Sequence, residues 1–491
     1  MPPALKSTLG SIFGIREDIL MTCTCEKTCP EEVDTSDSQK IPIWDIVLSI
    51  LTIGGFVAGV VACSHWPVVG HYADQVMNGV VNGYGYLAPV VIFGILAPSL
   101  SQVLRLAEQK RLIVNSFLWL ARKRLVSCLF GTAATAVLFS LPLLPSHNVN
   151  CWETLVKTLQ NLAYLATHSP YFYALYISVA AAFISLRVNW LKNIFEHIVE
   201  GIETLGTFMS YAVPALMFCM GAYVYQLPEH LKESLPAEAM QNGGLALTWI
   251  GGSIALGTPA GAVKVYFLIG GLVGAVCLIF YAGMLVFARL TIPGFSIRNH
   301  LIRYWFKVYP LLWATASESL ATPLNLSLVR KLYPQVSPLL RRFVVGMGSW
   351  LNINGTLICV FIMAGAISAM LGQHISLFEL VLSIPAVFLI GYGVPGMPGE
   401  LILFADPIAR LLSIPPELSS LFIALYVGFN FGLTDAFRSG HNSTDNCLSA
   451  LMLSVREKSL AGITPVEVLE AQLQITESNE QAAELVLPGR H

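Results

Sequence analysis

Long apolar runs constrain most strongly what this 491-residue chain can fold into. Six of them precede residue 290, and each can cross most or all of the roughly 30 Å hydrocarbon layer of a bilayer as a helix. They cover residues 46–63, 80–104, 125–144, 170–186, 205–225 and 265–288. Hydrophobic residues make up 55% of the chain and charged residues only 12%, which leaves too much apolar surface for a soluble domain to bury. The sequence therefore predicts an all-α polytopic membrane protein.

Basic residues predict how these runs are oriented. The loop assigned to residues 105–124 contains six Lys or Arg residues, whereas residues 64–79 contain none. Because basic loops stay on the cytoplasmic side, the N-terminus and the 105–124 loop are expected there. We expect a polar cytoplasmic N-terminal tail over residues 1–42, a transmembrane domain over residues 43–455 and a cytoplasmic C-terminal tail over residues 456–491.

The regular alternation of spans and loops breaks after residue 300. Residues 309–329 are apolar but have basic residues on both sides, so this segment is expected to enter the membrane and return. Residues 377–412 form a second such segment, with a centre rich in glycine and proline at residues 391–400. A non-helical tip at membrane depth must line a cavity or be buried in protein. Both segments are therefore predicted to be re-entrant helical hairpins.

A span with a polar middle follows each predicted hairpin. The first, residues 343–371, is interrupted by Asn352, Asn354 and Gly355, which predicts a broken helix. The second covers residues 428–453. The repeated unit of hairpin and polar span, in opposite orientations, is typical of inverted repeats in secondary transporters. The full prediction is about eight transmembrane helices plus two re-entrant hairpins.

The polar middle of residues 428–453 contains a charged stripe. At helical spacing one face collects five side chains, with Asp445 at its border. These five are Asp435, Arg438, Ser439, Asn442 and Asn446. Each Asp or Arg at the centre of a membrane helix costs roughly 2.5–3.5 kcal/mol. Asp435 and Arg438 could form a structural ion pair, but apolar side chains would join helices at lower cost, which favours a binding site for a charged solute.

Several other functions are not supported by the sequence. The net charge of −2 gives no basis for nucleic-acid binding, and no GxxxxGK[ST] motif for an ATP-driven pump occurs. Cys23, Cys25 and Cys29 lie in the N-terminal tail without a nearby fourth Cys or His, so they predict an unstructured tail rather than a metal site. We expect no enzymatic activity and no cofactor.

Four motifs in the second half, in this order along the chain, resemble the dicarboxylate/amino acid:cation symporter (glutamate transporter) family. Residues 317–319 (SES) lie where the family has its serine-rich first hairpin tip, and residues 352–356 (NINGT) resemble its NMDGT motif. Residues 393–396 (GVPG) are similar to its second hairpin tip, and residues 435–446 resemble the pattern DxxR[ST]xxNxxxD. The resemblance covers about residues 45–455 and is weak in the first half, where residues 211–214 (YAVP) resemble an element of the fifth helix.

The resemblance implies a substrate site for an acidic amino acid or a dicarboxylate. Arg438 would bind the side-chain carboxylate with its two-pronged guanidinium, Asp435 would accept the amino group, and Thr356 and Asn442 would bind the main-chain carboxylate or amine. The hairpin tips would close over the substrate. The complete implied site is Ser317, Glu318, Ser319, Thr356, Val394, Pro395, Gly396, Asp435, Arg438, Ser439 and Asn442.

The resemblance also implies an assembly and a motion. Family members are homotrimers in which a transport core slides past a scaffold like an elevator. Here the scaffold would be mainly residues 43–120 and 165–245, and the core mainly residues 121–145 and 262–455. The chain would import its substrate across the plasma membrane, or inner membrane of a bacterium.

The cation sites that the resemblance implies differ from the family pattern. They comprise Gly348, Asn352, Asn354, Asn442 and Asn446. Asn354 and Asn446 replace two aspartates that bind sodium in the family, and in the third span only Thr132 matches a pattern that Leu129 and Ala133 break.

Two additional carboxylates leave the coupling cation and the substrate class open. Glu318 and Glu400 lie at or beside the hairpin tips, where either could carry a proton if buried, although Glu400 could simply face water. The coupling cation is therefore sodium or a proton. Because Glu318 could partly neutralise Arg438, a neutral amino acid is an alternative substrate. An uncoupled sensor or channel-like homologue is the other alternative.

Overall fold

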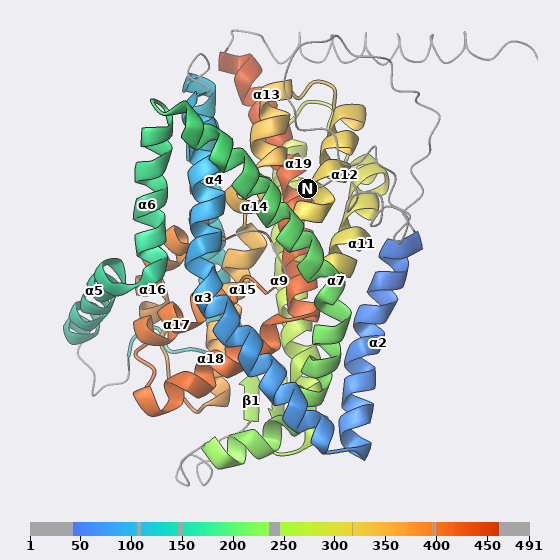
Figure 1. Cartoon of the computed structure of the whole chain (residues 1–491), viewed down its shortest axis with the longest axis vertical. Helices are drawn as coiled ribbons and strands as arrows, with labels where there is room; N and C mark the ends of the chain where they lie inside the picture. Colours follow the sequence, from blue (N-terminus) through green and yellow to red (C-terminus); the bar gives the residue numbers. More distant parts are fainter. Residues whose placement is uncertain are drawn as a thin grey trace, which may run out of the picture. The chain divides into compact units, whose positions relative to one another are not determined.

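The computed structural model describes residues 43–105, 110–145, 151–234, 246–316, 318–394, 396 and 399–460. Most of this part of the chain is helical (Figure 1). The predicted N-terminal tail with its three cysteines lies outside the described residues, as does the C-terminal tail from residue 461 onward.

Each of the six apolar runs lies largely within a helix. These helices are α2 (Ile43–His65), α3 (Val68–Arg105), α4 (Lys110–Leu138), α6 (Pro170–Ser185), α7 (Asn189–Ser234) and α9 (Pro259–Thr291). Two of them begin in the same way. The side chain of Ser169 accepts a backbone hydrogen bond from the first turn of α6, that of Thr258 accepts one from the first turn of α9, and a proline follows each of them. A proline in the first turn does not cost a hydrogen bond, because the first N–H groups of a helix have no partner within it.

The mostly helical structure agrees with the predicted fold class, but two of its elements were not predicted. Helix α5 (Cys151–His168) precedes α6, and a two-stranded antiparallel ribbon of β1 (Ala246–Trp249) and β2 (Gly252–Ala255) precedes α9. Trp249 pairs with Gly252, whose φ of 143° suits a residue without a side chain. The N–H of Ile250 in this turn donates to the carbonyl of Leu138 at 2.7 Å, so a tertiary contact holds the ribbon at the end of α4.

The two predicted hairpins are helix pairs joined by non-helical tips. The first consists of α11 (Phe306–Thr315) and α12 (Glu318–Leu332), with Ala316 in a left-handed conformation at the reversal. The second consists of α16 (Leu377–Ile390) and α17 (Ile402–Leu411), with the short 3₁₀ turn η5 (Gly391–Gly393) entering the tip. Their re-entry into a bilayer stays a prediction. Short segments α10 (Ile297–His300) and η3 (Leu301–Trp305) lead into the first hairpin.

The polar-centred spans are both interrupted. Segments α13 (Pro338–Leu340), η4 (Arg341–Gly346) and α14 (Gly348–Leu351) precede α15 (Asn354–Met370), with the predicted break at residues 352–353. The span predicted as one helix over residues 428–453 is different: α18 (Pro416–Asn430) ends there, and α19 (Leu433–Leu460) begins after a bend of 64°. Gly432, at φ 80°, allows the turn that the periodicity of the sequence does not reveal.

Length and composition identify fewer spans than the apolar runs suggest. Among the described residues, α9 is the one helix that is long and apolar enough to cross a membrane by itself, and α18 with α19 qualifies as a bent pair. Shorter apolar helices occur at Ile50–His65, Pro89–Ser101, Pro170–Ser185, Asn354–Met370 and Leu377–Gly393. The number of about eight spans therefore stays a prediction.

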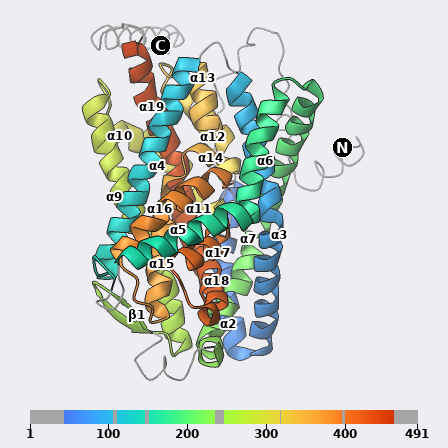
Figure 2. The ribbon, with the colours of Figure 1, turned by 90° about the vertical axis from the view of Figure 1, so that its left-hand side faces the viewer.

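The helices within residues 43–460 pack mainly in two groups. Helices α2, α3, α6 and α7 pack against one another, and α4, α9, α11, α12, α15 and α16 pack with α19 or its neighbours (Figures 1 and 2). Nearly all of α15 is buried, as are residues 438–454 of α19. A helix buried on all sides needs no polar face, which fits the apolar run of α15 after Thr356. The polar residues of α19 must therefore find their partners inside the protein.

Glycines allow α2 and α7 to approach closely. A Cβ atom on Gly59 of α2 would overlap the carbonyl oxygen of Phe218, and one on Gly221 of α7 would overlap that of Phe56. Small residues four positions apart, here Gly55 and Gly59, are typical of close helix crossings in membranes.

We predict that Gly59→Ala destabilises the protein by about 1–3 kcal/mol, because overpacking forces the backbones of α2 and α7 apart. Gly54→Ala in the same helix is the matched control, since no atom lies within 4 Å of its added Cβ. Alanine is the better helix former, so the control should be neutral or slightly stabilising. Thermal unfolding of the purified protein in detergent measures both; equal melting temperatures for the two variants would contradict the close crossing.

Candidate functional site

The two hairpin tips meet beside α19. The N–H of Glu318 in the first tip donates to the carbonyl of Gly396 in the second at 3.1 Å. The Ser439 hydroxyl donates to the Ala316 carbonyl at 3.2 Å, and the N–H of Gly399 donates to Asp435 Oδ2 at 2.8 Å. These bonds bring together three segments that are far apart in the sequence.

The Arg438 guanidinium lies at the centre of this junction and is fully buried. It forms hydrogen-bonded ion pairs with Asp435, one turn earlier on α19, and with Glu400 of the second hairpin. Glu318 Oε1 of the first hairpin lies 3.8 Å from the same guanidinium. Each hairpin therefore contributes one carboxylate to Arg438.

The break between α14 and α15 contributes further polar groups to this junction. Asn442 Oδ1 accepts the N–H groups of Gly355 at 2.6 Å and Thr356 at 3.3 Å, which have no partner within the first turn of α15. The Asn442 amide donates to Glu318 Oε1 and to the Thr356 hydroxyl, both at 2.8 Å. Thr356 in turn donates to Glu400 Oε1 at 2.8 Å. Asn442 thus holds the helix break and the first hairpin together.

This cluster contains more acidic side chains than basic ones. Glu318, Glu400 and Asp435 surround one guanidinium, and all four groups are at most 1% exposed. Removing an ion from water costs several kcal/mol unless an opposite charge compensates for it. The cluster therefore suits a ligand with an amino group, or another source of positive charge. A ligand carboxylate can reach Arg438 only where Glu400 or Asp435 gives way.

Most of the predicted substrate-site residues come together here. Ser317 and Pro395 lie outside the described residues, as does the side chain of Ser319. Val394 is buried at the start of the second tip. The others converge on the cluster: Glu318, Thr356, Gly396, Asp435, Arg438, Ser439 and Asn442. Glu400 does not face water, because it is fully buried against Arg438.

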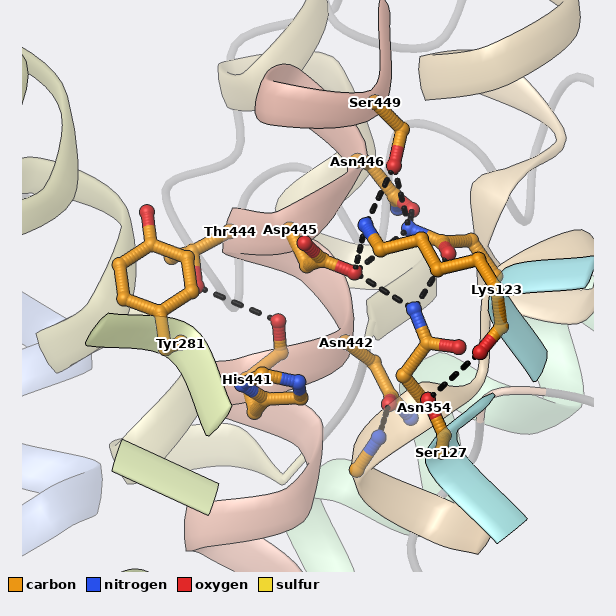
Figure 3. Close-up of polar contacts among 12 residues, drawn as sticks. Lys123, Ser127, Tyr281, Asn354, His441, Asn442, Thr444, Asp445, Asn446 and Ser449 are labelled. Carbon is orange, nitrogen blue, oxygen red and sulfur yellow. Dashed lines mark hydrogen bonds and ion pairs between the residues drawn. The ribbon is translucent and has the colours of Figure 1, made fainter. Parts of the chain in front are cut away.

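A second polar cluster contains most of the predicted cation-site residues (Figure 3). Asn354 Nδ2 donates to Asp445 Oδ2 at 2.6 Å, and Asn352 Nδ2 donates to Asn446 Oδ1 at 2.8 Å. Gly348 lies so close to Asn446 that a Cβ atom would overlap its side-chain amide. Asn442 contributes no oxygen to this cluster, because its Oδ1 accepts a hydrogen bond from the backbone of α15.

Lys123 is the residue that the sequence reasoning missed. Its ammonium lies 2.5 Å from Asp445 Oδ2 and donates to Ser449 Oγ at 2.7 Å. The assignment of residues 105–124 to a loop is wrong in its second part, because α4 begins at Lys110 and Lys123 is buried within it. Periodicity offers a weak signal, since Ser127 follows Lys123 at the helical spacing of four residues.

Lys123 lies between two arginines that have different environments. Arg122 is exposed, whereas Arg124 is buried, donates to the Phe388 carbonyl at 3.1 Å and lies 3.7 Å from the ring centroid of Tyr392. A guanidinium over an aromatic ring is a favourable cation–π contact. Only one residue of this basic triplet therefore faces outward.

The match to a family of known proteins lies in the second half of the chain. Residues 249–455 match the sodium:dicarboxylate symporter family. The C4-dicarboxylate transport protein 2 of Ralstonia nicotianae is 26% identical over 220 residues, which are 43% of this chain and 47% of that relative. The alignment thus spans about half of the relative's length. The matched segment contains all four motifs on which the predicted resemblance rests, and it confirms that resemblance; family and relative are transporters by name, not enzymes.

We predict that Arg438→Met destabilises the protein by about 3–5 kcal/mol, because it leaves three buried carboxylates without their counter-charge. Adding Glu400→Gln should recover part of this loss. Arg410→Met is the matched control: its ion pair with Asp406 at 3.0 Å is exposed, so its loss should cost about 0.3–0.5 kcal/mol. Thermal or denaturant unfolding of the wild type, the two single variants, the double variant and the Arg410→Met control measures the coupling, and strictly additive effects of Arg438→Met and Glu400→Gln would contradict it.

Proposed function

We propose, from its membership of the sodium:dicarboxylate symporter family over residues 249–455, that this integral membrane protein is a secondary active symporter. It imports an acidic amino acid or a dicarboxylate, driven by a sodium or proton gradient. The observation that carries this proposal is the buried Arg438 at the meeting point of two hairpin tips and a broken helix. A guanidinium in this position is the natural partner of a substrate carboxylate.

Substrate binding requires an exchange of partners at Arg438. The incoming carboxylate takes the place of Glu400, while Asp435 receives the amino group of an amino-acid substrate. Thr356 and Asn442 already present a hydroxyl and an amide at the same junction, so they can bind the remaining polar groups. Since the tips are joined through Glu318 and Gly396, they must separate to admit the substrate.

The transport cycle is proposed to follow the elevator type. Helices α2, α3, α6 and α7 pack mostly with one another, although α7 also contacts α9 and α2 contacts α11, and this grouping supports a scaffold and a transport core. The core mainly comprises residues 121–145 and 262–455. We further propose a homotrimer in the plasma or bacterial inner membrane, with both termini in the cytoplasm.

The pairing of Glu400 with Arg438 favours a second candidate, the uptake of a neutral amino acid. If Glu400 stays on Arg438 while substrate is bound, the guanidinium is neutralised within the protein. The site then offers Asp435 and Glu318 to an ammonium group and no free cation to a second carboxylate.

Uptake into proteoliposomes tests the function. Radiolabelled glutamate, aspartate, succinate and alanine are supplied under separately imposed sodium and pH gradients. We expect accumulation of an acidic substrate that collapses when the driving gradient is removed. Accumulation of alanine alone would support the neutral candidate, and accumulation of none of the four would contradict both.

Glu400→Gln tests the exchange at Arg438. Removing a competing charged partner worth about 1.5–3 kcal/mol should tighten acidic-substrate binding roughly 10- to 100-fold. Asp406→Asn, an exposed acid of the same hairpin, is the control and should leave binding unchanged. Equilibrium binding to the purified protein measures the effect. Weaker binding of acidic substrates by Glu400→Gln would show that Glu400 supports substrate binding instead of competing with it.

A further inference from the structure

The Lys123 cluster is a second charged centre that the proposed substrate site does not use. Its acid is Asp445, which is fully buried on α19, and its base is Lys123, which is 4% exposed on α4. The two side chains are 2.5 Å apart, and polar side chains from the helix break complete their surroundings (Figure 3). The cluster lies among the residues that the family resemblance assigns to cations.

The polar groups of this cluster are arranged for a carboxylate, not for a metal ion. Asp445 Oδ2 accepts three donors: the Lys123 ammonium, Asn354 Nδ2 at 2.6 Å and Asn352 Nδ2 at 3.2 Å. A carboxylate only accepts hydrogen bonds, so these asparagines must turn their N–H₂ groups toward it. A hard cation such as sodium needs oxygen atoms directed at one point.

The amide oxygens are largely occupied as well. Asn352 Oδ1 accepts Asn354 Nδ2 at 2.7 Å, and Asn446 Oδ1 accepts Asn352 Nδ2 at 2.8 Å. Asn442 Oδ1 is bound to the backbone of α15. Among the described residues, the cluster keeps two oxygens without a hydrogen-bond partner, Asn354 Oδ1 and Asp445 Oδ1. Two oxygens are too few to surround a hard cation, so these residues do not fit a sodium ion while Lys123 is present.

We propose that the Lys123 ammonium is a resident cation that permanently fills this site and makes the site independent of sodium. The ammonium supplies the positive charge that Asp445 needs, and it does so from the chain itself. Its connection to substrate binding is short: Asn354 precedes Gly355 and Thr356, whose N–H groups Asn442 holds. The break in the α14–α15 segment is therefore held in place without a dissolved ion.

A consequence for coupling rests on the proposed function. A cation that binds from solution links its own concentration to substrate binding, because each ligand changes the affinity of the other. A cation that is covalently part of α4 cannot be released, so this site cannot transmit a sodium gradient to the substrate. The occupancy of the site by Lys123 does not depend on the proposed function.

Sodium-dependent thermal stability tests the occupancy without any transport assay. The full-length protein is purified in detergent, and its melting temperature is measured in sodium chloride and in choline chloride at equal ionic strength. We expect no sodium-specific shift for the wild type. We expect Lys123→Met to melt at a lower temperature and to gain a sodium-specific increase of about 2 °C or more, because Asp445 then lacks its cation.

Three further variants separate this proposal from a merely structural ion pair. Lys123→Arg keeps a cation and should show no sodium response. Lys123→Met combined with Asp445→Asn removes both charges and should lose the sodium response that Lys123→Met gains. Arg122→Met, the exposed neighbour, should match the wild type. If Lys123→Met does not fold, the wild type and the double variant still decide the question.

Three results would overturn the proposal. One is a sodium-specific stabilisation of the wild type. The second is a folded Lys123→Met protein that responds equally to sodium and choline. The third is a double variant that gains the sodium response although both charges are gone. Because none of these readouts involves a substrate, failure of every uptake assay would contradict the proposed function and leave this proposal intact.

Discussion

The burial of charge on α19 is the constraint on which the arrangement of the surrounding elements depends. Arg438, Asp435 and Asp445 are at most 1% exposed, so each must be compensated by protein groups. Asp435 and Glu400 form ion pairs with Arg438, and Lys123 forms an ion pair with Asp445. The hairpin tips, the break before α15 and the buried face of α4 all meet α19 where these charges need partners.

The two charged clusters share a design. In each, a side chain of the protein occupies a place suited to a dissolved ion: the Glu400 carboxylate lies on Arg438, and the Lys123 ammonium lies on Asp445. The two internal partners differ in freedom. Glu400 belongs to a hairpin whose tip contains glycines, whereas Lys123 extends from the middle of a long helix. The first is therefore suited to exchange with a ligand, and the second is suited to stay.

Much of the candidate site could be predicted because its signals are local. Asn352, Asn354 and Gly355 interrupt an apolar run, and glycine and proline mark the second hairpin tip, so the break and the tip follow from short stretches of sequence. The bend at Gly432 and the β-ribbon were missed, since one glycine and two four-residue strands are weak signals within helical patterns. Lys123 was missed because it lies between two arginines, a pattern that usually marks a cytoplasmic loop.

The sequence by itself determined that the chain is largely helical and apolar, that charge is placed within one of its last helices, and that residues 249–455 resemble a known family. Only the tertiary structure decided which groups compensate that charge. Hydropathy and spacing act over neighbouring residues, whereas Arg438 and Glu400 are 38 positions apart and Lys123 and Asp445 are 322 apart by their numbers. A buried charge requires a partner, but the sequence alone does not say which one will be within reach.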